Sequence, residues 1–297
     1  MVLTQVLFLP SYHSVLFTYM WFFTFLSRCK KEKINKEQDT EHSSPVSVSP
    51  VLTSSLVPCD QETGNNQVIL LQLDLASLKS VRSFVENVLR TESRLDLLIN
   101  NAGLMNDGKT QEGFGMIFGV NHLGHFLLTV LLLDRLKASG PSRVVTVASR
   151  GYEYGKIDFN CLTTHRDFAL GDNDYQLFLK YCHSKLCNVL FTYELAKRLQ
   201  DSNVTCYSLH PGVIKTEIGR NAKLWMKILF APVSLLLTDA ESGAQTTLHC
   251  ALEQGIEHLS GHYFTHCAPL LNVMPKARDD AAAKKLWELS ESFCGLS

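Results

Sequence analysis

The sequence has few charged residues, and neither sign dominates. Charged residues make up 19% of the 297 residues, and 28 Lys and Arg nearly balance 29 Asp and Glu, which leaves a formal charge of −1. A disordered chain carries more charge and less than the 45% apolar content found here, and a general polyanion binder carries a basic excess. The composition therefore excludes both classes of protein, and nucleic acid is not an expected partner.

The nine cysteines lack the spacing of a metal or redox motif. No C-x-x-C occurs, and the closest pair, Cys182 and Cys187, has neither zinc-finger nor redox-motif spacing. Thiols in α/β domains of the cytosol are usually reduced and fill apolar space. We therefore expect reduced cysteines, most of them in the core, and no metal site.

Charge is also missing from a long N-terminal stretch. No charged residue occurs over 2–26, which is rich in Phe, Leu and Val, and a basic cluster follows at 28–33. Positive charge on the C-terminal side of an apolar run is typical of a signal anchor whose following domain is cytoplasmic. A buried pair of apolar strands is the alternative. We predict a membrane anchor with its basic flank over 1–35, a Ser/Pro-rich linker over 36–60 and a folded domain over 61–297.

Strand and helix patterns alternate beyond residue 61. A continuous apolar run suited to a buried parallel strand covers Gln67–Leu73. Further strands are expected at Leu95–Ile99, Arg143–Ala148 and Val204–Leu209. Helical periodicity covers Ser77–Arg90, Glu112–Lys137, Leu177–Gln200 and a last helix that begins near Ala240. This alternation predicts an α/β, doubly wound parallel sheet with helices on both faces, and ligands that bind at the carboxyl ends of the strands.

Polar or turn-forming residues follow each expected strand. They are Asp74 and Leu75, then Asn100-Asn101-Ala102-Gly103, then Ser149, and finally Pro211-Gly212. Because the carboxyl ends of parallel strands meet at one edge of a sheet, these residues are expected to lie close together.

Tyr181 and Lys185 are four residues apart, so they share one face of the helix that comes after Ser149. An ammonium about 4 Å from a phenol contributes roughly 4 kcal/mol at an effective dielectric near 20, or about three pKa units. We therefore expect Lys185 to lower the pKa of Tyr181, so that the phenol exchanges a proton with an alcohol or carbonyl while Ser149 holds the same oxygen. For the Y-x-x-x-K spacing taken alone, an exposed i,i+4 pair of side chains with no catalytic role is the alternative.

Six motifs occur in a fixed order along the chain. They are LDLAS at 73–77, NNAG at 100–103, VNHLGHF at 120–126, VVTVAS at 144–149, YCHSK at 181–185 and HPGVIKT at 210–216. From about Gln61 onward the chain therefore resembles a short-chain dehydrogenase/reductase, and within that family the retinol dehydrogenase-like group. The resemblance implies a Rossmann-like fold and hydride transfer between NAD(P) and a lipophilic, retinoid-like alcohol or aldehyde. A catalytically silent binding or regulatory protein is the alternative.

The resemblance also implies roles for single residues. Tyr181 is the expected acid/base, Lys185 its electrostatic partner and a ribose ligand, and Ser149 orients the substrate oxygen together with Tyr181. Asn121 is expected to support a water relay to Lys185, and stabilisation of a helix kink is its alternative role. The expected cofactor-binding residues are Asp74, Leu75, Asn101, Ala102, Gly103, Tyr181, Lys185, Pro211, Gly212, Val213 and Thr216. For Thr216, an ordinary helix cap is the alternative.

Other implications of the resemblance concern the surroundings of the site. His122, His125 and His183 are expected to be neutral helix or core residues. The apolar segment Asn221–Leu237 matches the family's mobile lid over the substrate, with a packed core helix as the alternative. NADP is slightly favoured over NAD, and a homodimer is expected by analogy. The expected location is the endoplasmic reticulum membrane with a cytoplasmic catalytic domain, and a cytoplasmic protein is the alternative.

One part of the family pattern is missing from the sequence. The pattern opens with a strand, a glycine-rich turn T-G-x-x-x-G-x-G and a helix whose N-terminus holds pyrophosphate. Gly64 is the only glycine before residue 100. We therefore expect the N-terminal strand-helix-strand unit to be absent, the strand at Gln67–Leu73 to expose an unpaired edge, and dinucleotide binding to be weak.

Overall fold

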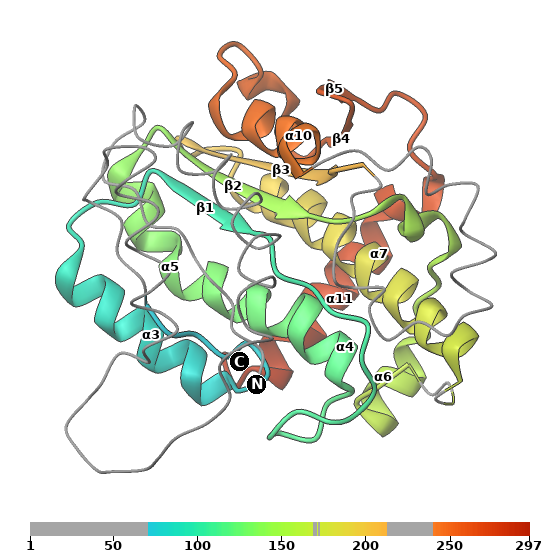
Figure 1. Cartoon of the computed structure of the whole chain (residues 1–297). Helices are drawn as coiled ribbons and strands as arrows, with labels where there is room; N and C mark the ends of the chain where they lie inside the picture. Colours follow the sequence, from blue (N-terminus) through green and yellow to red (C-terminus); the bar gives the residue numbers. More distant parts are fainter. Residues whose placement is uncertain (1–70, 169–170, 172, 213–239) are drawn as a thin grey trace, which may run out of the picture.

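The computed structural model describes residues 71–168, 171, 173–212 and 240–297. Within these residues one five-stranded sheet organises the molecule (Figure 1). Its strands are β1 (Leu97–Asn100), β2 (Ser142–Val147), β3 (Val204–His210), β4 (Tyr263–Thr265) and β5 (Ala268–Pro269), in that order across the sheet. The first four strands are parallel and β5 is antiparallel to β4.

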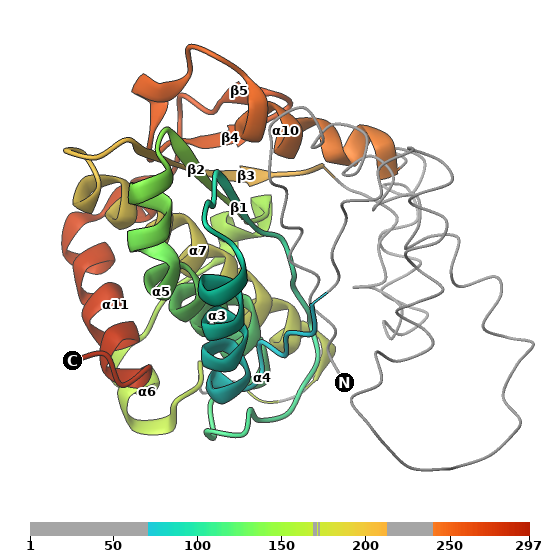
Figure 2. The ribbon, with the colours of Figure 1, turned by 90° about the vertical axis from the view of Figure 1, so that its left-hand side faces the viewer.

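Helices cover both faces of this sheet, as Figures 1 and 2 show. On one face lie α3 (Leu78–Thr91), α5 (His125–Ser139), α7 (Asp174–Arg198) and α11 (Asp280–Phe293), and on the other lies α10 (Ala240–Leu252). The short elements are α4 (Met116–Phe118), η3 (Gly119–Gly124), η4 (Arg150–Tyr154), α6 (Phe159–His165), η6 (Glu257–Leu259) and η7 (Pro275–Arg278). The predicted α/β fold with a parallel sheet between helices is confirmed.

The local sequence explains why the predicted elements form. The hydroxyl of Ser77 accepts a hydrogen bond from the backbone N–H of Ser80 and so caps α3. Every residue of β2 is buried, as expected for a central parallel strand with both faces covered by helices. Between Ser77 and His210 the structure places helices and strands at the predicted positions, with ends that differ by a few residues.

One long helical stretch from Met116 to Ser139 passes beneath the sheet. It consists of α4, the π-helical turn η3 and α5. By length and composition this described helix could span a membrane, but 78% of its most apolar window is buried inside the protein. Its apolar character is therefore explained by its place in the core.

Several expectations about the ends of the domain were wrong or lie outside the described residues. Leu71–Leu73 form no strand, and no described strand pairs with the outer edge of β1, so these residues have no ladder to join. Leu73 is nevertheless fully buried, because its side chain packs into the core. The predicted last helix is followed by β4, β5 and α11, which the sequence reading missed. The predicted anchor, the linker and the lid at Asn221–Leu237 lie outside the described residues.

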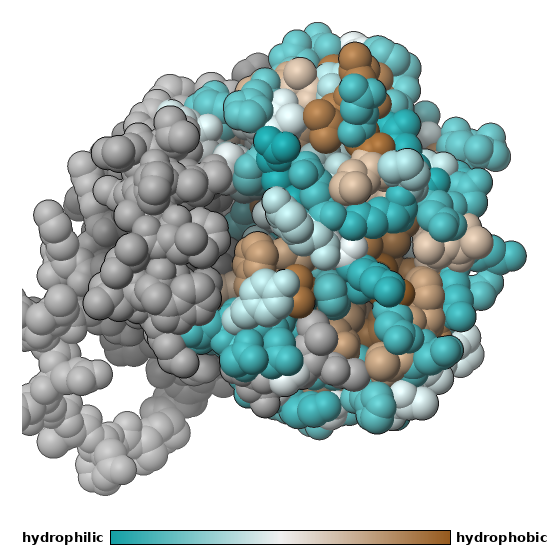
Figure 3. Space-filling view, turned by 90° about the vertical axis from the view of Figure 1, so that its right-hand side faces the viewer, coloured by the Kyte–Doolittle hydropathy of each residue, from teal (hydrophilic) through white to brown (hydrophobic). Residues whose placement is uncertain are grey.

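The surface and the cysteines agree with the composition. Hydrophobic residues on the face shown in Figure 3 are scattered among hydrophilic ones. All seven described cysteines are free thiols, and the five buried ones are Cys182, Cys187, Cys206, Cys250 and Cys294. The prediction of reduced, mainly buried cysteines is confirmed for this part of the chain.

Candidate active site

The predicted site residues gather at the carboxyl ends of the strands. Asn101–Gly103 follow β1, Ser149 comes two residues after β2, and Pro211 and Gly212 follow β3. Helix α7 runs beneath this edge and brings Tyr181 and Lys185 to it. Val213 and Thr216 lie outside the described residues.

Lys185 is a buried cation held by the end of β2. Its side chain donates from Nζ to the carbonyl oxygen of Val147 at 2.9 Å. Nζ lies 5.5 Å from the centre of the Tyr181 ring, on the shared face of α7. Burial lowers the pKa of Lys185 to about 8. The two side chains are therefore close enough to act on each other, as their spacing predicted.

The predicted direction of the Tyr181 pKa shift was wrong for this arrangement. Burial raises the pKa of Tyr181 to about 12, and the hydrogen bond with Ser149 opposes this effect only in part. The ammonium of Lys185 donates to the Val147 carbonyl and lies 5.5 Å from the centre of the Tyr181 ring. Desolvation therefore outweighs the attraction between the two groups.

Ser149 begins the short helix η4 and faces Tyr181. Its hydroxyl oxygen accepts from the backbone N–H of Gly151 at 3.1 Å, which caps η4, and its side chain also hydrogen-bonds Tyr181. A Cβ atom at Gly151 would lie 3.3 Å from the sulfur of Cys182 and 3.6 Å from a ring carbon of Tyr181. The small residue therefore lets η4 pack closely against α7.

Asn121 links the π-helical turn to the site. Its Oδ1 accepts from the N–H of Leu104 at 2.8 Å, and its Nδ2 donates to the Leu104 carbonyl at 2.9 Å and to the Ser184 hydroxyl at 3.0 Å. Ser184 in turn donates to the carbonyl oxygen of Tyr181 at 2.7 Å. Asn121 thus lies in the π-helical turn η3 and links this turn to α7 through its hydrogen bond to Ser184, beside Tyr181. Its role in a proton relay stays a prediction.

The residues near Lys185 fit the nicotinamide-ribose part of a dinucleotide. A Cβ atom at Gly103 would lie 3.3 Å from Nζ of Lys185, so the glycine keeps open the space beside the ammonium. One of the three ammonium N–H groups is used by Val147, which leaves the others for ligand hydroxyls. Gly212 has a φ of 94°, a conformation that favours glycine where the chain leaves β3.

Asp74 and Leu75 are the described residues predicted to flank the adenine of the cofactor. Oδ1 of Asp74 accepts from the backbone N–H of Ala76 at 2.9 Å, and the Leu75 side chain is buried, with its Cβ close to Gly124. The Leu75 side chain is therefore part of the core and is not exposed to a ligand. The cofactor roles of both residues stay predictions.

The three histidines near the site behave as core residues. Burial lowers the pKa of His122 to about 3, and those of His125 and His183 to about 4. All three are therefore neutral at pH 7, as predicted. His183 accepts from the backbone N–H of Lys156 at 3.1 Å, which fixes the chain after η4.

Sequence reasoning missed three groups that position the side chains predicted to be catalytic. They are the carbonyl of Val147, the hydroxyl of Ser184 and the bare Cα of Gly151. Of these three groups, only Ser184 belongs to one of the six sequence motifs, YCHSK at 181–185, so its position in that motif was the one hint in the sequence. The contacts of a main-chain carbonyl and of a glycine Cα cannot be predicted from the sequence, because every residue has a carbonyl and a glycine has no side chain to reveal its neighbour.

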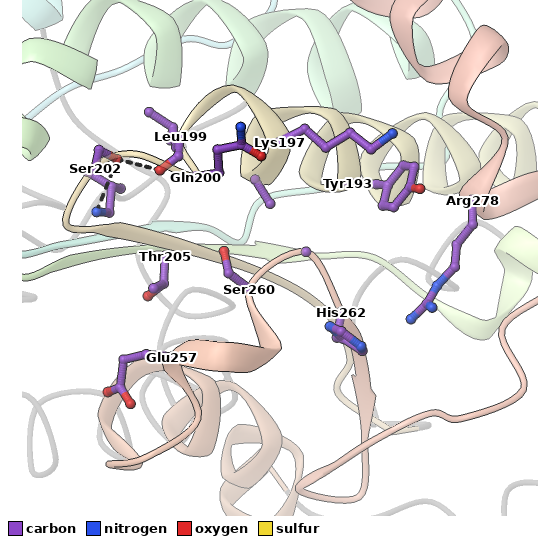
Figure 4. A pocket seen from close by; sticks show the side chains of 13 residues that line it. Tyr193, Lys197, Leu199, Gln200, Ser202, Thr205, Glu257, Ser260, His262 and Arg278 are labelled. Carbon is purple, nitrogen blue, oxygen red and sulfur yellow. Dashed lines mark hydrogen bonds between the residues drawn. The ribbon is translucent and has the colours of Figure 1, made fainter.

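A cavity of about 440 Å³ lies away from these side chains (Figure 4). It is bordered by the end of α7, the start of β3 at Val204 and Thr205, and the turn before β4. Lys197, on its wall, is already paired with Asp280 at 2.5 Å. None of the predicted site residues lines this cavity, so it is separate from the catalytic edge of the sheet.

Comparison with known proteins agrees with this geometry. The family pattern described as short chain dehydrogenase matches residues 49–161. Over 237 residues the chain is 48% identical to retinol dehydrogenase 12 of Homo sapiens, covering 79% of this chain and 72% of that protein. It is 49% identical over 238 residues to dehydrogenase/reductase SDR family member 13 of Bos taurus, covering 80% of this chain and 62% of that protein.

A solved structure shows the same fold at lower identity. The crystal structure of an uncharacterised protein from Mycobacterium Paratuberculosis superposes with a TM-score of 0.60 at 30% identity, covering 82% of this chain and 81% of that one. The chain therefore belongs to the short-chain dehydrogenase/reductase family. Within that family it is similar to the retinol dehydrogenases, and it is a nicotinamide-dependent oxidoreductase by class.

Proposed function

We propose that this protein interconverts a lipophilic, retinoid-like alcohol and its aldehyde, with NADP as the preferred nicotinamide cofactor and Tyr181 as the acid/base. The observation that carries the proposal is the grouping of Ser149, Tyr181 and Lys185. Ser149 hydrogen-bonds Tyr181, and the buried Lys185 lies beside the same ring. The similarity to retinol dehydrogenase 12 supports the choice of substrate. A silent binding protein has no need of this grouping.

The chemistry of each side chain follows from its surroundings. The bound nicotinamide supplies or accepts the hydride. Tyr181 donates its hydroxyl proton to the substrate oxygen during reduction and accepts it during oxidation. Ser149 donates a hydrogen bond to the same oxygen and so stabilises the negative charge that develops there. Lys185 stabilises the phenolate that Tyr181 leaves behind, because its charge lies next to the ring in a buried, weakly screened place.

The substrate is tested by turnover of retinal and retinol. The enzyme for this test is a variant whose residues 1–60 are replaced by the glycine-rich N-terminal segment of a retinol dehydrogenase relative. We expect reduction of retinal with NADPH and oxidation of retinol with NADP⁺, both more efficient than turnover of ethanol and acetaldehyde. Equal efficiency with the short and the lipophilic substrates would contradict the proposed substrate class.

Cofactor affinity of the natural chain is a separate prediction. Backbone N–H groups at a helix N-terminus normally hold pyrophosphate, and residues 1–60 contain no glycine with which to form that turn. We expect very weak binding when NADPH or NADH is titrated calorimetrically into the 297-residue chain, and clear binding by the glycine-restored variant. The proposed reaction is therefore expected from the glycine-restored variant, with little or no turnover by the unmodified chain. A micromolar dissociation constant for the natural chain, about −8 kcal/mol, would contradict this prediction.

We further propose that the protein is attached to the endoplasmic reticulum membrane through its N-terminal segment, with the catalytic domain on the cytoplasmic side. The charge-free run over 2–26 and the basic cluster at 28–33 support this proposal. The folded domain is proposed to cover 61–297, and a homodimer is proposed by analogy with the family.

A further inference from the structure

The short helix η4 determines how the Ser149 side chain is oriented. The hydroxyl oxygen of Ser149 accepts from the backbone N–H of Gly151 at 3.1 Å, and its carbonyl oxygen accepts from the N–H of Tyr152 at 3.0 Å. Because the first bond occupies an acceptor site of the hydroxyl, its O–H group is left to donate to another group. Both bonds depend on the winding of η4, so the winding of η4 fixes where the Ser149 proton can point.

Helix η4 is too short to be stable by itself. It is a 3₁₀-helix of five residues, Arg150–Tyr154, and 3₁₀ turns have poorer hydrogen-bond geometry than α-helices. Isolated helices of this length do not form in water. The ion pair inside η4 joins Arg150 to Glu153 at 3.2 Å, but the arginine side chain is 62% exposed, and such surface pairs contribute little. Contacts with other parts of the chain therefore hold η4 in place.

Helix α7 provides one of these contacts. The N–H of Gly155 donates to the carbonyl oxygen of Tyr152 at 2.9 Å and so ends η4. A Cβ atom at Gly155 would lie 2.6 Å from the carbonyl oxygen of Cys182, so the two backbones touch beside Tyr181. This contact fixes the distance between η4 and α7. It does not supply donors to the carbonyl groups at the end of η4, which have no partner inside the helix.

Lys276 supplies these donors. Its Nζ donates to the carbonyl oxygen of Glu153 at 2.6 Å and to that of Gly155 at 2.7 Å. Lys276 lies in η7, and the N–H of Met274, just before η7, donates to the Tyr152 hydroxyl at 3.4 Å. A cation at a helix C-terminus both satisfies the last carbonyls and interacts favourably with the helix dipole. A segment far along the chain thus holds the end of η4.

We propose that Lys276 is a positioning residue for the catalytic site: its ammonium clamps the end of η4 and thereby keeps the Ser149 hydroxyl oriented toward Tyr181 and the substrate oxygen. In this role Lys276 touches neither substrate nor cofactor, and it acts only through Ser149. The catalytic consequence rests on the proposed function, whereas the clamp itself does not.

Amide hydrogen exchange measures the clamp without cofactor or turnover. The amides of Tyr152 and Gly155 are both hydrogen-bonded within η4, so they exchange when it opens. Lys276→Met keeps an unbranched side chain and removes the donors. We expect these two amides to exchange at least about tenfold faster in this variant of the 297-residue chain, because hydrogen bonds from a charged donor are lost. Lys276→Arg returns a cation with several N–H donors and should restore most of the protection.

Lys109→Met is the matched control. Nζ of Lys109 also donates to the carbonyl oxygen of the last residue of a short helix, His165 of α6, at 3.4 Å. Its removal should leave the amides of Tyr152 and Gly155 unchanged. A folded Lys276→Met variant with natural exchange at these two amides overturns the proposal, and so does an equal acceleration in Lys109→Met.

A second measurement needs no substitution and so does not depend on a variant that folds. Amine-acetylating reagents attack the free amine, so an ammonium held by two carbonyl oxygens reacts slowly. In a brief treatment of the natural chain, Lys276 should be acetylated more slowly than Lys284, whose side chain is 69% exposed. The urea-unfolded chain gives the intrinsic rates of the two lysines. Equal protection of both lysines in the folded chain would overturn the clamp.

A double-mutant cycle in the glycine-restored variant tests the link to Ser149. Lys276→Met should lower kcat for retinal reduction about tenfold, with calorimetric binding of NADPH unchanged. In a Ser149→Ala background the same substitution should change kcat by less than about twofold, because the hydroxyl that it positions is gone. An undiminished tenfold loss in that background would overturn the positioning role. Absence of retinal turnover in the parent variant would instead count against the proposed function, and it would leave the exchange and acetylation results unaffected.

Discussion

The two buried histidines should make the fold sensitive to mild acid. The pKa values of His122 and His125 are about 3 and about 4 in the folded protein, against a usual value of 6.5. Between these values the unfolded chain binds protons that the folded chain does not, so stability falls as the pH falls below 6.5. At pH 5 each histidine is 1.5 units below its unfolded pKa. At 1.36 kcal/mol per unit, each removes about 2 kcal/mol, and both together about 4 kcal/mol.

Urea unfolding at pH 7 and pH 5 measures this loss. A loss of about 4 kcal/mol is a large part of the 5 to 15 kcal/mol typical of a folded domain, so the urea midpoint should fall clearly. His122→Leu and His125→Leu should each reduce the loss between pH 7 and pH 5 by about 2 kcal/mol, whatever their stability at pH 7. The rest of the pH dependence remains, because His183 and His210 also have pKa values lowered to about 4. His258→Gln, at an exposed position, is the control and should keep the full pH dependence. Retention of the full pH dependence in both leucine variants would refute the reasoning.

Two other predictions concern packing and membrane attachment. Trp287→Ala should cost about 3 to 5 kcal/mol of unfolding free energy, because this buried ring of α11 packs at 5.0 Å between centroids on Phe126 and lies under the guanidinium of Arg198. Leu271→Ala, at a residue 87% exposed, is the control for urea unfolding, and equal losses would contradict the packing argument. The N-terminal run predicts resistance to carbonate extraction and digestion of the catalytic domain by protease added to intact microsomes. Release by carbonate would contradict the anchor, and protection from protease would contradict its orientation.

The sequence was informative where a feature depends on local spacing. Periodic apolar residues and a Ser77 cap predicted α3, and the RVVTVA pattern at 143–148 predicted the strand that is β2. The order of strands and helices then placed Ser149, Tyr181 and Lys185 at one edge of the sheet. Each of these predictions needs only neighbours in the chain and the general rule for parallel sheets.

The sequence was uninformative where a feature depends on the surroundings. The spacing of Tyr181 and Lys185 gives their shared face but not their burial, and burial decides the direction of the Tyr181 pKa shift. Strands β4 and β5 have three and two residues, too few for a periodic signal. Leu71–Leu73 read as a strand because they are apolar, yet a strand also needs a neighbouring ladder, and none of the described strands supplies it.

Turnover of the Tyr181→Phe variant tests the central claim most directly. The substitution, made in the glycine-restored chain, removes the one hydroxyl through which the proposed reaction transfers its proton. General acid-base participation is typically worth about 10² to 10⁴ in rate, so we expect retinal reduction to slow at least a hundredfold. Calorimetric binding of NADPH should stay unchanged, which separates chemistry from cofactor binding. A Tyr181→Phe enzyme that binds NADPH and reduces retinal at a near-normal rate would contradict the assignment of this site.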